Sequence, residues 1–170
     1  MTRRDLFHKW LFYALALAPV WLLDAQILPR LPLFGVTPML LPLAAAAVAV
    51  LEGAYAGAGF GLAVGLWWEA AYPGGFGGLV FGLTLAGLVM GHLSQYVLRQ
   101  SFPGYLLCSA GLLAALDALR IAQRLLTHSA DLGSMLQVAA PEVLWSLVWS
   151  PLVWLLFRRI YRRVGGTRLA

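Results

Sequence analysis

The stretch GAYAGAGFGLAVGLWWEAAYPGGFGG, residues 53–78, decides how this chain folds. It predicts a helix over residues 54–71 and a turn at Pro73-Gly74-Gly75. Small residues recur every four positions along one ridge of this helix, at Gly53, Gly57, Gly61 and Gly65. In lipid, rows of small residues at this spacing let two helix backbones approach closely. We therefore predict that this helix packs tightly on a neighbour, and the next predicted helix repeats the pattern in the pairs Gly78/Gly82 and Gly87/Gly91.

The composition of the whole chain indicates an integral membrane protein. Of its 170 residues, 61% are hydrophobic and 11% are charged, and the mean hydropathy is +0.80. Soluble proteins have about 45–50% apolar and about 25% charged residues. Apolar windows cut at charges and at Pro or Gly predict six membrane-spanning helices, at about residues 10–28, 37–52, 54–71, 75–97, 103–126 and 142–160. The predicted fold class is all-α, a single integral-membrane domain over residues 1–170.

Two boundaries follow from local patterns. The first span is expected to be an uncleaved helix rather than a secretion signal, because its apolar run continues through Leu23, well beyond the small-residue triplet at 14–16. Pro141 is expected to open the sixth helix, since proline is tolerated in the first turn of a helix.

Basic residues gather at both ends of the chain, which predicts that both termini are cytoplasmic. The N-terminal group is Arg3, Arg4 and Lys9. Near the C-terminus, two adjacent pairs four residues apart form one basic helix face, made of Arg158, Arg159, Arg162 and Arg163. This face either anchors the helix at the membrane, where each arginine could add about 1 kcal/mol of attraction to anionic lipid, or contacts a cytoplasmic filament.

A second group of charges maps to the opposite, outer side of the predicted bundle. It comprises Asp24, Glu69, Asp117, Arg120, Arg124 and Glu142. A charge near the membrane interior is costly and normally faces the bundle with a partner. Asp117 and Arg120 have i,i+3 spacing, and we hypothesise that Glu69 pairs with Arg120 or Arg124. The alternative is that these side chains extend individually to the lipid headgroups.

The sequence shows no pattern typical of an enzyme. Its three histidines, His8, His92 and His128, lie on different segments without metal-ligand spacing. No phosphate-binding loop follows a predicted strand, and no nucleophile elbow is present. Cys108 lies in an apolar run and is interpreted as a packing residue. We therefore predict no catalytic activity, metal, cofactor or nucleic-acid partner.

Two adjoining segments resemble the MreD family of rod shape-determining proteins of the bacterial inner membrane. The first is ILPRLPLFGVTPMLLPL, residues 27–43, and the second is the glycine-rich stretch over residues 53–93. The family pattern falls on Leu33, Phe34, Gly35, Pro38, Gly61, Gly65, Leu66, Glu69, Gly74 and Gly77. Glu69 stands where the family more often has Asp. The resemblance covers about residues 25–95, and beyond them it rests on length, hydropathy and the basic C-terminal end.

The resemblance implies a non-enzymatic component of the machinery that builds the lateral cell wall. Its implied partners are an MreC-type bitopic membrane protein, the actin-like MreB, and the wall-synthesising polymerase and transpeptidase, with membrane lipid around them. The family is also similar in architecture to the six-helix substrate-binding subunits of energy-coupling-factor vitamin transporters. This similarity implies an alternative, a subunit that captures a small metabolite from outside. Such a site needs converging polar groups, and few amides, Gln26 and Gln137, lie near the predicted outer side.

Overall fold

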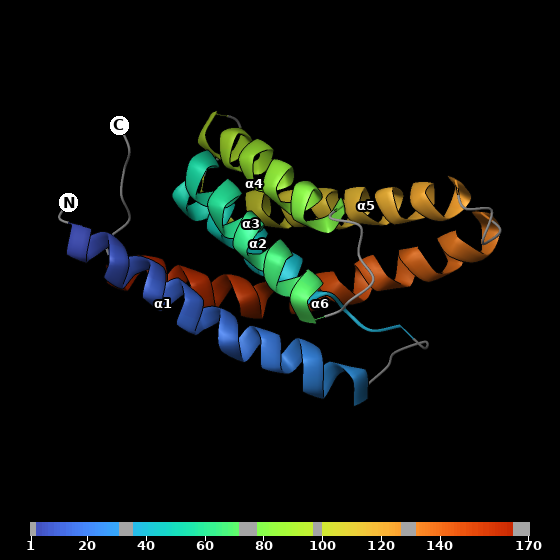
Figure 1. Cartoon of the computed structure of the whole chain (residues 1–170), viewed down its shortest axis with the longest axis horizontal. Coiled ribbons are helices and arrows are strands. Elements are labelled where there is room, and N and C mark those ends of the chain that lie inside the picture. The colour runs from blue at the N-terminus through green and yellow to red at the C-terminus, as the bar shows by residue number, and fades with distance from the viewer. Residues whose placement is uncertain (1–2, 31–35, 72–77, 97–99, 127–131, 165–170) are drawn as a thin grey trace.

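The computed structural model describes residues 3–30, 36–71, 78–96, 100–126 and 132–164, and it is all-α, as predicted (Figure 1). The helices are α1 (Arg3–Leu22), α2 (Leu40–Glu52), α3 (Ala54–Ala71), α4 (Gly78–Tyr96), α5 (Phe102–Leu126) and α6 (Leu132–Val164). After α1 the chain continues through a π turn, η1 (Leu23–Ile27), and a 3-10 turn, η2 (Leu28–Arg30). Helix α3 has the predicted limits, whereas α6 begins ten residues before the predicted 142.

The early start of α6 corrects the expected role of Pro141. Both Pro141 and Pro151 lie inside this 33-residue helix. Proline removes a backbone hydrogen bond, but in membrane helices the freed backbone groups find other partners. Pro141 therefore does not open the sixth helix.

Among the described residues, four helical segments are long and apolar enough to cross a membrane: Phe7–Arg30, Gly78–Tyr96, Phe102–Ala122 and Gln137–Val164. The chain is thus a multi-pass membrane protein, with two fewer such segments than the six predicted spans. Helix α2 has 13 residues, which gives a length of about 20 Å against a hydrocarbon core of about 30 Å. Helix α3 has 18 residues, but its many glycines and its two tryptophans lower its hydropathy.

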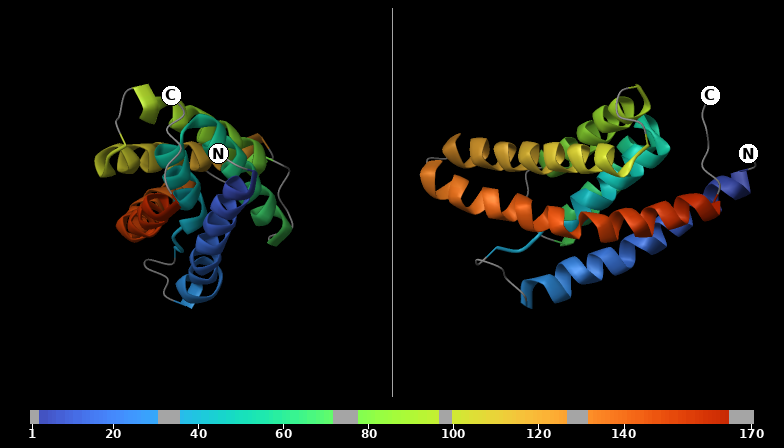
Figure 2. Two further views of the ribbon diagram at one scale, coloured as in Figure 1. Left: turned by 90° about the vertical axis from the view of Figure 1, so that its left-hand side faces the viewer. Right: turned by 180° about the vertical axis from the view of Figure 1, so that it is seen from behind.

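Helix α2 forms the centre of the bundle. All 13 of its residues are buried, and it packs against α1, α3, α4, α5 and α6. Figures 1 and 2 show α2 enclosed by the other helices, with α1 beginning and α6 ending at the same end of the bundle. We call this the terminal end and the opposite one the distal end. The shared position of the first turn of α1 and the last turn of α6 agrees with an even number of helices.

The N-terminus of α2 is capped by other parts of the chain. The backbone N–H of Leu40 donates to Asp24 Oδ1 at 2.8 Å, and the N–H of Met39 donates to Ser146 Oγ at 2.9 Å. The first N–H groups of a helix lack partners within it, so buried ones need side-chain acceptors. Asp24 from η1 and Ser146 from α6 provide these acceptors, which lets α2 begin inside the protein.

A single residue, Gly53, connects α2 to α3. Its φ of 95° lies in the left-handed region that glycine adopts readily. After this turn the two helices lie side by side, and a Cβ added to Gly57 would stand 2.6 Å from the Cβ of Ala49. The two helices therefore form a hairpin with almost no loop.

Helix α3 then packs along α4, its most extensive neighbour. Added Cβ atoms would lie 2.7 Å from Gly87 O at Gly57, 2.9 Å from Leu83 C at Gly61 and 2.6 Å from Val80 Cα at Gly65. Because real Cβ atoms essentially never approach backbone this closely, only glycine fits at these positions. The glycine row predicted from the sequence lies directly on the backbone of α4.

Candidate functional site

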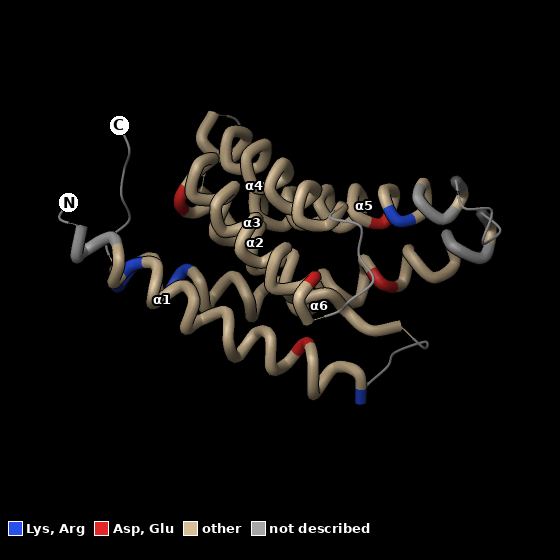
Figure 3. The backbone as a smooth tube through the Cα atoms, viewed as in Figure 1, with Lys and Arg blue, Asp and Glu red and all other residues tan. Residues whose placement is uncertain are grey.

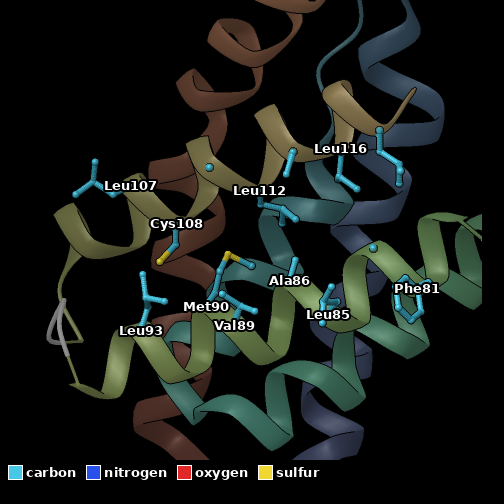
Figure 4. Close-up of a pocket in the computed structure, with 14 residues that line it drawn as sticks. Phe81, Leu85, Ala86, Val89, Met90, Leu93, Leu107, Cys108, Leu112 and Leu116 are labelled. Atoms are coloured by element: carbon cyan, nitrogen blue, oxygen red, sulfur yellow. The ribbon is translucent and has the colours of Figure 1, made fainter. Parts of the chain in front are cut away.

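One face of α4 packs tightly on α3, whereas a second face borders a cavity. This cavity, which we call the α4–α5 groove, has a volume of about 550 Å³ (Figure 4). Helix α4 contributes Phe81, Gly82, Leu85, Ala86, Val89, Met90 and Leu93 to its lining, and α5 contributes Leu107, Cys108, Gly111, Leu112, Ala115, Leu116 and Leu119. Apart from the Cys108 thiol and Met90, the lining side chains are hydrocarbon, and several of the leucines and Phe81 are exposed on the protein surface.

Small residues recur every four positions on both walls of the groove. Gly82 and Ala86 lie on α4, and Gly111 and Ala115 lie on α5. An added Cβ at Gly111 would meet no atom within 4 Å, and one at Gly82 would meet only leucine side chains of α5, at 3.5 and 3.7 Å. Gly82, predicted as part of the close-packing set, thus makes no close backbone contact. Gly78, from the same set, is the half-buried first residue of α4.

The groove offers van der Waals contact but no group that could orient a polar ligand. Its shape and its apolar lining suit an aliphatic surface, such as one face of a transmembrane helix or a lipid acyl chain. In lipid, helices associate where small residues let their surfaces approach.

A polar site lies at the distal end of the bundle, between α5 and α6. Arg120 Nη1 donates to Glu142 Oε1 at 3.4 Å and lies 3.9 Å from Asp117 Oδ1. Ser146, one turn after Glu142, donates to the Glu142 carbonyl oxygen at 2.7 Å and also accepts the N–H of Met39. The predicted outer residues Asp117, Arg120 and Glu142 therefore meet, and Ser146 links them to the α2 cap formed by Asp24.

Glu69 does not pair with Arg120. Within the described residues, Arg120 forms ion pairs with Asp117 and Glu142. Glu69 Oε1 is buried and has no hydrogen-bond partner among the same residues. The reason is topological, because α3 packs on α2 and α4 but does not contact α5. The side chain of Arg124, the other predicted partner, lies outside the described residues.

An ion pair that the sequence analysis did not predict lies near the terminal end. Lys9 of α1 pairs with Glu52, the last residue of α2, and Tyr13 donates its hydroxyl to Glu52 Oε1 at 2.7 Å. All three side chains are buried. Two signals could have found the site, since Glu52 is an isolated carboxylate in an apolar segment and Lys9 and Tyr13 have i,i+4 spacing on α1.

Figure 3 shows that most of the charged residues described lie toward the two ends of the bundle. The predicted basic face, formed by Arg158, Arg159, Arg162 and Arg163, lies exposed on the last turns of α6. The described part of the chain contains no group of three or more His, Cys, Asp or Glu residues that could hold a metal ion. Comparisons of the chain with protein-family models, with curated proteins and with solved structures give no match.

Proposed function

We propose that this protein is a non-enzymatic membrane scaffold whose α4–α5 groove receives the transmembrane helix of a partner. The observation that carries the proposal is the lining of the groove, which is almost entirely apolar and has small residues at helical spacing on both walls. The same spacing joins α3 to α4 within this chain, through Gly57, Gly61 and Gly65. A partner helix in the groove would use the same packing between two chains.

The complex in which this scaffold works is proposed from the resemblance to the MreD family. We propose that it works in the cell-elongation complex of the bacterial inner membrane, which makes lateral peptidoglycan. An MreC-type bitopic protein has a single membrane helix, which is the kind of partner that the groove suits. MreB and the wall-synthesising polymerase and transpeptidase would be further partners. We propose that the terminal end, with its arginines, faces the cytoplasm, as the positive-inside rule favours.

The alternative is a subunit that captures a small metabolite, and Glu69 is the observation that favours it. Its Oε1 is buried and has no hydrogen-bond partner among the described residues, so it could accept a hydrogen bond from a ligand. The other distal charges favour the scaffold, because Asp24 caps α2 and Arg120 already contacts two carboxylates. Co-purification of a bitopic partner supports the scaffold, whereas a tightly bound small molecule supports the alternative.

The substitution Gly111→Leu tests the groove directly. A leucine at this position has open space around its Cβ, so the protein should fold. The leucine side chain fills the groove, so the partner helix should no longer bind there. We expect at least a tenfold loss of co-purified MreC-type protein when the two full-length chains are expressed together, since losing about 1.4 kcal/mol of contact lowers affinity tenfold.

Gly59→Leu is the matched control. Gly59 also has no atom within 4 Å of an added Cβ, but it is exposed on α3, away from the groove. The control should keep its partner. Full recovery of the partner with Gly111→Leu, in protein as stable as the parent, would remove the groove from the proposal.

A further inference from the structure

A second cavity, between α1 and α6, combines an apolar part with a strongly basic part. It has a volume of about 760 Å³, and we call it the α1–α6 groove. Its apolar lining consists of Pro19 and Leu23 from the α1 side and Leu152, Leu155 and Leu156 from α6. Its basic lining consists of Arg158, Arg159, Arg162 and Arg163. The two parts follow one another along α6 over about 16 Å, given a rise of about 1.5 Å per residue.

The arginines of this groove have charge available for a ligand. All four are exposed, and within the described residues none of them forms an ion pair. No carboxylate is among the described residues that line the groove. Arg120 at the distal end is different, because two carboxylates surround it. Guanidinium groups bind phosphate oxygens in pairs of parallel hydrogen bonds, so four of them favour a phosphate with net negative charge.

The apolar half of the groove selects the kind of phosphate. Leu152 and Leu155 are 47% and 63% exposed, and they continue the groove from the arginines toward the middle of a membrane-crossing segment. A free inorganic phosphate has no group for this apolar half. An occupant with a phosphate at one end and an alkyl chain at the other contacts both halves.

We infer that the α1–α6 groove is a binding site for one anionic phospholipid, with its phosphate on the α6 arginines and an acyl chain along Leu152 and Leu155. This inference does not depend on the proposed function. It gives the basic face of α6 a defined ligand, in place of general attraction to the membrane surface. Each arginine contributes about a fivefold increase in affinity for anionic lipid.

The test uses the full-length chain in detergent, with bound lipids counted by native mass spectrometry during titration. The probes are phosphatidylglycerol, phosphatidylcholine and inorganic phosphate. We expect one saturable phosphatidylglycerol, at least tenfold weaker phosphatidylcholine, and no competition from millimolar phosphate. Equal binding of the two lipids, or displacement by phosphate, would overturn the inference.

Paired variants separate the two halves of the site. The double change Arg158→Gln with Arg162→Gln should weaken phosphatidylglycerol binding about 25-fold, from about fivefold for each arginine. The same pair changed to Lys keeps its charge and should retain most of the binding. Arg30→Gln is the matched control, because Arg30 is exposed at the far end of the α1 segment. A loss of about fivefold with Arg30→Gln, the share expected for one arginine, would show that net charge alone is responsible and would overturn the inference.

Leu155→Trp tests the apolar half at constant charge. A tryptophan on this exposed position fills the groove without entering the core, so folding should be preserved. We expect phosphatidylglycerol binding to fall at least fivefold. Unchanged lipid binding by both Leu155→Trp and the glutamine pair, with reduced recruitment of a cytoplasmic filament by the glutamine pair, would assign the arginines to a protein partner instead.

Discussion

The two faces of α4 carry similar small residues, but one face forms a close helix contact and the other borders a groove. Toward α3, Gly87 and Gly91 meet Gly57 and Gly53 with backbone against backbone. Toward α5, Gly82 and Ala86 border an open groove. The difference lies in the opposing helix, since α3 presents its own glycine row, whereas α5 presents Leu112, Leu116 and Leu119 beside its small residues. Small residues at helical spacing close an interface only when the facing helix has them in register.

The molecule therefore has a closed part and an open part. The closed part consists of α2, α3 and the face of α4 that packs on them, and it includes the buried Lys9–Glu52 pair, which fastens α1 to it. The open part consists of the α4–α5 groove and the half-exposed Arg120 network at the distal end. Substitutions in the closed part should affect folding, and substitutions in the open part should affect binding or have small effects.

The largest expected effect is that of Gly61→Leu. An added Cβ would already stand 2.9 Å from the carbonyl carbon of Leu83, so a leucine must force α3 and α4 apart. We expect little folded protein to be recovered in detergent, as measured by size-exclusion chromatography. Helix separation exceeds the usual cost of overpacking, about 1–3 kcal/mol, because the obstacle is backbone rather than a mobile side chain.

Two controls accompany this change. Gly59→Leu introduces the same side chain on the exposed face of α3, and Leu62→Ala shortens a side chain that is 44% exposed. Both should give near-normal recovery. Equal losses from Gly61→Leu and Leu62→Ala would contradict the close contact of α3 with α4.

The second effect in size is that of Glu52→Ala. Removing one member of a buried ion pair leaves the other charge uncompensated, which typically costs about 3–5 kcal/mol. Lys9 is 5% exposed and Tyr13 is fully buried, so neither can reach water without moving helix α1. Thermal unfolding in detergent should show a large drop in stability. The double change Glu52→Leu with Lys9→Met should recover part of it, because no unpaired charge remains. A double variant as unstable as Glu52→Ala alone would argue against the pair.

The sequence predicts the closed part better than the open part. The spacing of glycines can be read from a single helix. Gly57, Gly61 and Gly65 were identified because a row of glycines every four residues lets another helix backbone approach closely. The partners of charged residues depend on which helices become neighbours. Glu69 and Arg120 share a predicted depth but lie on helices that do not touch. The central place of α2 was also not predictable from hydropathy, because a buried short helix and a membrane span both read as apolar windows.

The smallest expected effect concerns the Arg120–Glu142 pair. Its measurement shows whether Arg120 of α5 is coupled to α6 or to α3 at the distal end. The two side chains are 31% and 17% exposed, and partly exposed pairs contribute about 0.2–1 kcal/mol. A double-mutant cycle with Arg120→Leu and Glu142→Leu, followed by thermal unfolding, should give a coupling energy in this range. The same cycle with Glu69→Ala in place of Glu142→Leu should be additive within about 0.3–0.5 kcal/mol, because residues without shared partners do not couple. Coupling of Arg120 to Glu69 but not to Glu142 would mean that α3 reaches α5 at the distal end, and that the open side of α4 is closed there as well.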